Sequence, residues 1–189
     1  MFPGERDLLT ERAELVATMA DLSDDEFESG RTLCSEWSPR DILAHVVGID
    51  RGLVQYVGAL GRVSRGNDRI VTAARARTRA DLMRDAGQWA VAPSLAARIG
   101  AYGLLGDVAV HHQDVLRGLG RSRLVPESSS RAILREGAVL GAKRLLRHRI
   151  VPNDVGRPLG RGREVHGTAE QLGMWLAGRD SVTPELKGL

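Results

Sequence analysis

Two carboxylates and an imidazole occur close together in the second half of the chain. Asp107, His111 and Asp114 are spaced four and then three residues apart, so an α-helix would place all three on one stripe. The surrounding segment, residues 94–120, is apolar or small at most positions, and its helix should therefore be largely buried. Burying ionisable groups is costly unless they pair with one another or bind a metal. The spacing therefore predicts either a buried Asp–His ion pair or a metal site.

A third ligand is available from an earlier predicted helix. Ser38 is a good N-cap and Pro39 suits the first helical position. His45 follows between Ile42 and Ile49 on the apolar stripe of that helix. Zinc takes three or four N, O or S ligands, and facing helices of a bundle can supply them. A hydrogen-bonded core histidine beside a separate Asp–His pair fits the same spacing equally well.

The neighbouring residues are assigned by helical geometry. Asp114, one turn beyond His111, is expected to orient a ligand histidine from behind. His112 is turned about 100° away from His111, so only His111 can share a site with Asp107.

The elements that must position these residues follow from apolar periodicity. Helices are expected over residues 5–22, 38–60, 78–92, 94–120, 126–146 and 168–178. Residues 23–37 and 61–77 read as irregular connections, the second with at most a helical turn near residues 70–75. Residues 147–166 read as a small hairpin or extended loop, and the last ten residues as a loose tail. The prediction is a mainly all-α protein, with a four-helix bundle over residues 1–122 and a C-terminal region, 123–189, packed on it.

Composition narrows the functional classes. The 189 residues carry a net charge of +3 and a single cysteine, Cys34, which excludes an intrachain disulfide and favours a reducing compartment. The N-terminus lacks a signal-peptide pattern and no apolar run approaches about 20 residues, so a cytoplasmic protein is expected. The arginine-rich stretch 62–84 has no interleaved aromatic residues for base stacking, which disfavours nucleic-acid binding. The sequence leaves the oligomeric state open, a homodimer included.

Three segments resemble a known family. CSEWSPRDILAH, residues 34–45, resembles the C-x-x-W-S-x-R-D-x-L-A-H signature of the DinB-like, mycothiol-dependent maleylpyruvate isomerase family. GDVAVHHQD, residues 106–114, resembles its G-E-x-x-x-H-x-x-D segment, and residues 160–179 are similar to the end of its C-terminal region. The resemblance implies a DinB-type four-helix bundle that holds a divalent metal, usually zinc, through His45, Asp107 and His111. Asp107 departs from the pattern, which has the longer glutamate.

The resemblance also implies a chemistry. Mycothiol would take the open coordination position, and metal coordination would deprotonate its thiol to a nucleophile at neutral pH. The expected activity is that of a mycothiol-dependent transferase or isomerase acting on a small electrophile. Arg40 and Arg179 are candidates for binding anionic groups of the thiol or substrate. The resemblance does not assign a substrate to this chain, because its C-terminal region is shorter than in better-known members of the family.

Two other functions remain open at this point. One is a non-catalytic DinB-like bundle, with or without metal, that has a stress or interaction role. The other, less favoured, is a basic helical nucleic-acid binder.

Overall fold

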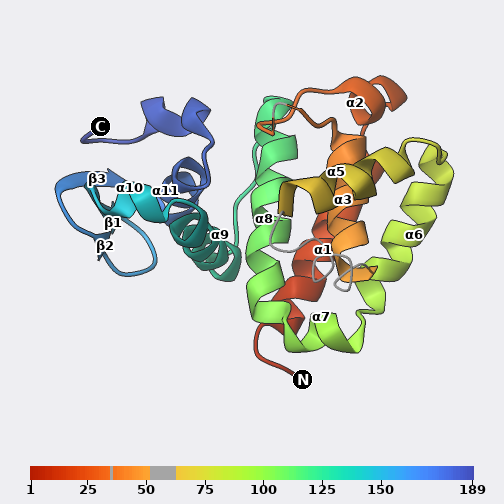
Figure 1. Ribbon diagram of the computed structural model, residues 1–189, viewed down its shortest axis with the longest axis horizontal. Helices are drawn as coiled ribbons and strands as arrows, with labels where there is room; N and C mark the ends of the chain where they lie inside the picture. The colour runs from red at the N-terminus through yellow and green to blue at the C-terminus, as the bar shows by residue number, and fades with distance from the viewer. Residues whose placement is uncertain (35, 52–62) are drawn as a thin grey trace.

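The computed structural model describes residues 1–34, 36–51 and 63–189, and these are mainly helical (Figure 1). The helices are α1 (Glu5–Ala20), α2 (Asp24–Ser29), α3 (Pro39–Arg51), α5 (Val63–Ala74), α6 (Arg79–Val91), α7 (Leu95–Ile99), α8 (Ala101–Gly118), α9 (Glu127–Leu140), α10 (Ala142–Leu145), α11 (Ala169–Leu176) and the 3-10 helix η1 (Asp180–Glu185). The strands are β1 (His148–Pro152), β2 (Leu159–Gly160) and β3 (Arg163–Gly167).

Four of the helices form the expected bundle. Helix α1 packs against α6 and α8, and α3 packs against the same two helices. Leu15 and Met19 of α1 and Ile42 and Leu43 of α3 are fully buried in the shared core. The prediction of a mainly all-α, DinB-like four-helix bundle with small additions is confirmed.

Side-chain caps start the helices where the sequence indicated. Thr78 accepts a hydrogen bond from the backbone N–H of Asp81 at the start of α6. Thr168 and Gln171 form a capping box at the start of α11, as their spacing predicted. Residues 52–60, the end of the helix expected over residues 38–60, lie outside the described residues.

Two segments expected to be irregular are helical instead. In the first, Ser23 and Glu26 form a capping box that begins α2, and this short helix buries Phe27 completely. The Ser-x-x-Glu spacing that marks the box is present in the sequence. The prediction of an irregular link over residues 23–37 is therefore wrong for α2.

The second such segment contains α5, which packs against α3. Val71 and Ala74 of this helix are buried, and Gly48 of α3 allows the close approach of the two helices. A Cβ atom added at Gly48 would lie 2.3 Å from the side chain of Ile70. The expected polar connection over residues 61–77 is wrong because a few small and apolar side chains provide enough contact surface on one face.

Two long predicted helices are each divided at a glycine. Gly100 separates α7 from α8, and Gly141 separates α9 from α10. Helix α8 then runs unbroken through the Asp107–Asp114 stripe, so the division leaves the candidate site on one continuous helix.

The C-terminal region combines a helix pair with a small sheet. Helix α9 packs against both α8 and α11, and in Figure 1 α8 lies between α9 and the rest of the bundle. The strand order is β2-β1-β3, with β2 antiparallel and β3 parallel to β1. The β1–β2 pair is the expected hairpin, whereas β3 was not foreseen as a separate parallel strand.

The final ten residues are not a loose tail, contrary to the prediction. Val182 in η1 is buried to 1% exposure, and Lys187 pairs with His166 in an isolated β-bridge. These contacts fix the end of the chain to the small sheet. Among the described residues, no helix is both long and apolar enough to cross a membrane.

Candidate metal centre

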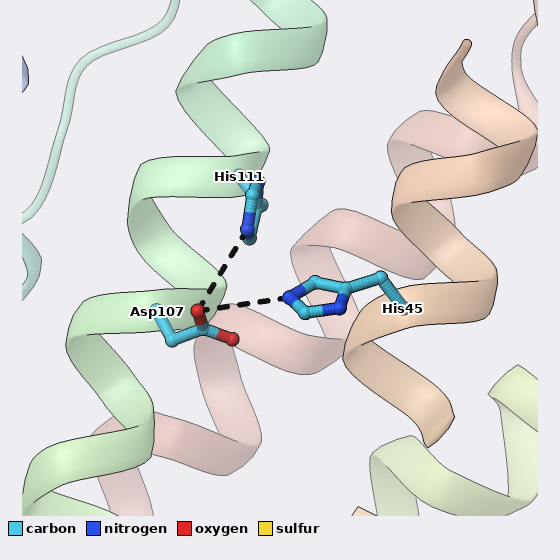
Figure 2. A group of neighbouring side chains, drawn as sticks. All are labelled: His45, Asp107 and His111. Carbon is cyan, nitrogen blue, oxygen red and sulfur yellow. Dashed lines mark ion pairs between the residues drawn. The ribbon is translucent and has the colours of Figure 1, made fainter. Parts of the chain in front are cut away.

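Helices α3 and α8 bring the three predicted ligands together. Figure 2 shows His45 of α3 pointing at Asp107 and His111 of α8. Asp107 Oδ1 lies 3.9 Å from His45 Nε2 and 3.7 Å from His111 Nε2. One ligand atom from each residue lies within 4.8 Å of the other two. Residues 62 positions apart in sequence therefore present two nitrogens and an oxygen to one point.

The three side chains differ in burial, and only one of them is open to a small molecule from solvent. The His45 and His111 side chains are only 3% and 9% exposed, whereas the Asp107 side chain is 27% exposed. The histidines are thus held in the bundle interior, and the carboxylate lies where a small molecule can reach it.

His111 is oriented from behind by a buried carboxylate. Its Nδ1 lies 2.9 Å from Asp114 Oδ2, and Asp114 is fully buried. Arg179, just after α11, donates to both oxygens of Asp114, at 2.9 and 2.6 Å. This arrangement places the proton of His111 on Nδ1 and turns Nε2 towards Asp107. Asp114 thus contacts the ring nitrogen of His111 that faces away from Asp107.

The electrostatics of the stripe follow from burial and pairing. Burial opposes ionisation of Asp114, but hydrogen bonds from His111 and Arg179 outweigh it and lower the pKa of this carboxyl group. For His111, burial is likewise outweighed, here by Asp114 and Asp107, and its pKa is raised. Burial lowers the pKa of His45, so this imidazole is the neutral, ligand-competent form near pH 7.

The ring of Trp37 packs against the two histidines of the group. The Trp37 ring centroid lies 4.6 Å from that of His45 and 5.7 Å from that of His111. The sequence alone assigned Trp37 no role at this site. The available signal was its position within the same signature segment as His45.

The residues present fit a divalent cation. Two imidazole nitrogens and a carboxylate oxygen form a donor set typical of zinc and related ions. Within the described residues, the Nε2 atoms of His111 and His45 lie 3.7 and 3.9 Å from Asp107 Oδ1, beyond hydrogen-bond length. The buried Nδ1 of His45 has no hydrogen-bond partner among the described residues.

The two predicted anion-binding arginines have structural partners. Arg40 donates to Glu28 at 2.6 Å and to the carbonyl oxygens of Ala74 and Arg77. It thereby holds the end of α5 against the start of α3, beside a surface cavity of about 840 Å³ that Trp37 also lines. Arg179 forms hydrogen bonds with both oxygens of Asp114. Its guanidinium therefore acts on the three candidate ligands only through that carboxylate.

In a second cluster of possible metal ligands, an arginine side chain already pairs with the carboxylates. His112 Nδ1 lies 2.8 Å from Glu11 Oε1, and Glu14 lies nearby. Arg123 forms ion pairs with both glutamates, which neutralises the carboxylates that a metal would need. His112 stands apart from the His45–Asp107–His111 group, as helical geometry predicted.

Comparison with known proteins gives one match. Residues 8–89 match the family model of the mycothiol maleylpyruvate isomerase N-terminal domain. The matched segment contains Trp37 and His45 and ends before α8, which carries Asp107 and His111. No curated protein and no solved structure matches the chain. Over residues 8–89, the chain is thus similar to the mycothiol maleylpyruvate isomerase N-terminal domain.

Proposed function

We propose that this protein is a metal-dependent transferase or isomerase that uses a low-molecular-weight thiol, mycothiol, against a small electrophilic substrate. The observation that carries the proposal is the convergence of His45, Asp107 and His111 in a chain whose N-terminal part matches this family. The spacing alone fitted a buried ion pair equally well. The long distances between Asp107 and the two histidines favour a shared cation.

His45, Asp107 and His111 would hold the metal, for which zinc is the first candidate. When bound, such an ion lowers the pKa of a coordinated thiol and so supplies a nucleophile at neutral pH. The thiolate can add to an activated double bond for isomerisation or attack an electrophile for S-transfer.

The protein's own residues supply position and shelter. Asp114 fixes the ring of His111, and Arg179 fixes Asp114 through two hydrogen bonds. Trp37 covers the two imidazole rings and keeps water from that side. The partly exposed side chain of Asp107 marks the side from which thiol and substrate would enter.

Cys34 is unsuited to act as the nucleophile itself. Burial, followed by the negative charge of Asp114, raises the pKa of its thiol to about 11. A thiol with that pKa is almost entirely protonated at neutral pH. The reacting thiol is therefore supplied by a small molecule in this proposal.

We also propose how the chain divides into two regions. We place the boundary between the bundle and the C-terminal region at residues 122 and 123. Two hydrophobic clusters support the division: one fills the bundle, and the other joins α9, α11 and the sheet. Helix α8 contributes Val108 to the first and Ala109 and Val110 to the second. The location of the protein in the cytoplasm and its assembly as a homodimer are predictions from the sequence.

Metal analysis of the purified protein tests the proposal. We expect one divalent ion per chain in the parent, and its loss in His45→Ala and in His111→Ala. His166→Ala is the matched control, because His166 lies on β3 with a 37% exposed side chain and should retain the ion. Mycothiol should then perturb the absorption spectrum of the cobalt-substituted parent but not that of the two site variants.

A folded parent protein that binds no metal in any divalent salt would overturn the proposal and favour the non-catalytic bundle. Metal that survives both histidine substitutions would assign the ion to another site and overturn it equally. Steeply salt-dependent binding to DNA or RNA would instead favour the nucleic-acid binder.

A further inference from the structure

A cleft of about 250 Å³ lies between α5 and α6 on the surface of α3. Both of these helices pack against α3 (Figure 1). Leu43 and Val47 of α3 line the cleft, and each is two positions from His45. They therefore lie about 160° around the helix from that histidine. The cleft is thus separate from the candidate metal centre.

The inner lining of the cleft is apolar. Its floor is formed by Leu43 and by Leu82 of α6, which are 0% and 3% exposed. Four further lining residues are small: Ala44, Gly48, Ala73 and Ala74. These short side chains leave a space that larger ones would fill. Its volume equals that of about eight liquid water molecules, which suits an apolar ligand of roughly eight to ten non-hydrogen atoms.

The rim of the cleft carries one uncompensated positive charge. Arg77, just after α5, donates to Asp85 of α6 at 2.8 Å, so these two charges cancel. Arg69 of α5 also lines the cleft, and its side chain is exposed. Within the part of the chain that the structure describes, Arg69 forms no hydrogen bond and no ion pair. A guanidinium of this kind is a natural partner for a carboxylate, which it can bind through two hydrogen bonds.

We propose that this cleft is a second ligand site, which binds a small monocarboxylic acid. The hydrocarbon or aromatic body of the acid lies between α5 and α6, where its burial is favourable, and its carboxylate pairs with Arg69. A neutral hydrocarbon would leave Arg69 without a partner, and a second carboxylate would meet Asp85 at the rim. The site goes beyond the proposed function and requires no metal.

Isothermal titration calorimetry with octanoate and 1-octanol tests the charge at the rim. At about pH 7 the acid is ionised, and we expect one octanoate to bind per chain. Arg69→Gln should weaken octanoate binding about tenfold, the effect of removing one nearby charge, and leave the affinity for 1-octanol unchanged. Arg84→Gln is the matched control, because it makes the same change of charge at an exposed ion pair on α6 and should alter neither affinity.

A second variant tests the cleft itself. Ala73 is exposed, so Ala73→Leu should fold normally while its longer side chain occupies the space of the ligand. We expect the affinities for octanoate and for 1-octanol to fall by more than about tenfold, an amount that corresponds to losing most of the apolar contact. Ala80→Leu is the control, since Ala80 is also exposed but lies on α6 outside the cleft.

Three outcomes would overturn the inference. One is a folded parent that binds no octanoate, and another is an equal octanoate affinity in the parent and Arg69→Gln. The third is octanoate binding that persists in Ala73→Leu but is lost in His111→Ala, which would place the acid on the candidate metal centre. A parent that binds octanoate in this cleft but no metal would refute the proposed function alone, so the two failures are distinguishable.

Discussion

At the scale of single residues, the shorter carboxylate at position 107 is the main departure from the family pattern. The structure shows that aspartate is long enough, because one oxygen, Oδ1, already lies 3.7 and 3.9 Å from the two histidine nitrogens. Donor atoms that share an ion with bonds near 2 Å lie roughly 3 to 4 Å apart. The helices therefore lie close enough for the shorter side chain to serve.

Asp107→Asn should reduce metal affinity more than 100-fold, because an amide oxygen is a neutral and weaker ligand than a carboxylate. Asp107→Glu should bind metal within about tenfold of the parent, since the side chain is partly exposed and can bend. Competition with a chromogenic chelator measures both affinities. Equal affinities for parent and Asp107→Asn would remove residue 107 from the ligand set.

The carboxylate behind His111 should matter to both metal and fold. Asp114→Asn should lower metal affinity 10- to 100-fold, because His111 loses the partner that fixes its ring. It should also destabilise the protein by roughly 3–5 kcal/mol, because Arg179 is left with its charge uncompensated. Chelator competition and urea unfolding give the two values, and Arg84→Gln, at an exposed ion pair on α6, is the control expected to change neither. Retention of both properties in Asp114→Asn would refute this role.

At the scale of elements, the C-terminal region is built on a close pair of helices, α9 and α11. A Cβ atom at Gly137 of α9 would lie 2.2 Å from the carbonyl oxygen of Gly173 of α11. A Cβ atom at Gly173 would in turn lie 2.5 Å from the carbonyl oxygen of Ile133. The two backbones therefore touch, and neither position has room for a side chain.

Gly137→Ala should destabilise the protein by about 2–4 kcal/mol, because the helices must separate to admit one methyl group. Gly87→Ala on α6 is the matched control, since nothing lies within 4 Å of its added Cβ, and it should stabilise by up to about 1 kcal/mol. Thermal or urea unfolding measures both variants. Similar effects of the two substitutions would show that α9 and α11 are not in tight contact.

The elements also show what the sequence could and could not predict. Caps such as Thr78 and Thr168 are local, so they marked the starts of α6 and α11 correctly. Helix α5 was missed because its contact with α3 depends on Gly48, a non-local fit that periodicity does not reveal. The tail was missed for the same reason, since Val182 is buried only by distant elements.

The candidate site was predictable in its composition but not in its surroundings. Spacing grouped Asp107, His111 and Asp114, helical periodicity offered His45 as a third ligand, and the family resemblance favoured a metal site over a buried ion pair. The contacts of Trp37 with both imidazole rings arise only from tertiary packing. No local pattern encodes them.

At the scale of the whole molecule, one buried polar network ties the bundle to the C-terminal region. Glu11 of α1 accepts hydrogen bonds from Ser129 of α9 at 2.6 Å and from Arg123 of the preceding loop, and it pairs with His112 of α8 at 2.8 Å. His112 in turn contacts Thr18 at 2.9 Å. Three helices and a loop therefore depend on one carboxylate that is 1% exposed.

This network predicts a pH-dependent stability. Burial opposes ionisation of Glu11, but His112, Arg123 and Ser129 outweigh it and lower its pKa below the ordinary 4.5. The stabilisation is therefore fully present above about pH 4.5 and is lost as the pH falls through the lower, folded-state pKa. Glu11→Gln should cost roughly 3–5 kcal/mol at pH 7, and the cost should shrink in acid, where the parent also becomes protonated.

Urea unfolding of parent and Glu11→Gln at several pH values measures this difference. Glu127→Gln, at an exposed ion pair, should change stability by no more than about 0.5 kcal/mol at any pH. A Glu11→Gln cost that stays constant from pH 7 to strongly acidic solution would contradict the assignment.

The clamp of Arg179 on Asp114 has a consequence for biosynthesis. A ribosome makes His45, Asp107 and His111 well before Arg179, which is 68 positions after His111, and synthesis proceeds at roughly 5–20 residues per second. For several seconds a nascent chain thus contains all three proposed ligands, while Asp114, which orients His111, still lacks its partner Arg179. If the protein functions as proposed, tight metal binding should therefore come late, and a chain interrupted before position 179 should release its ion more readily than a completed one.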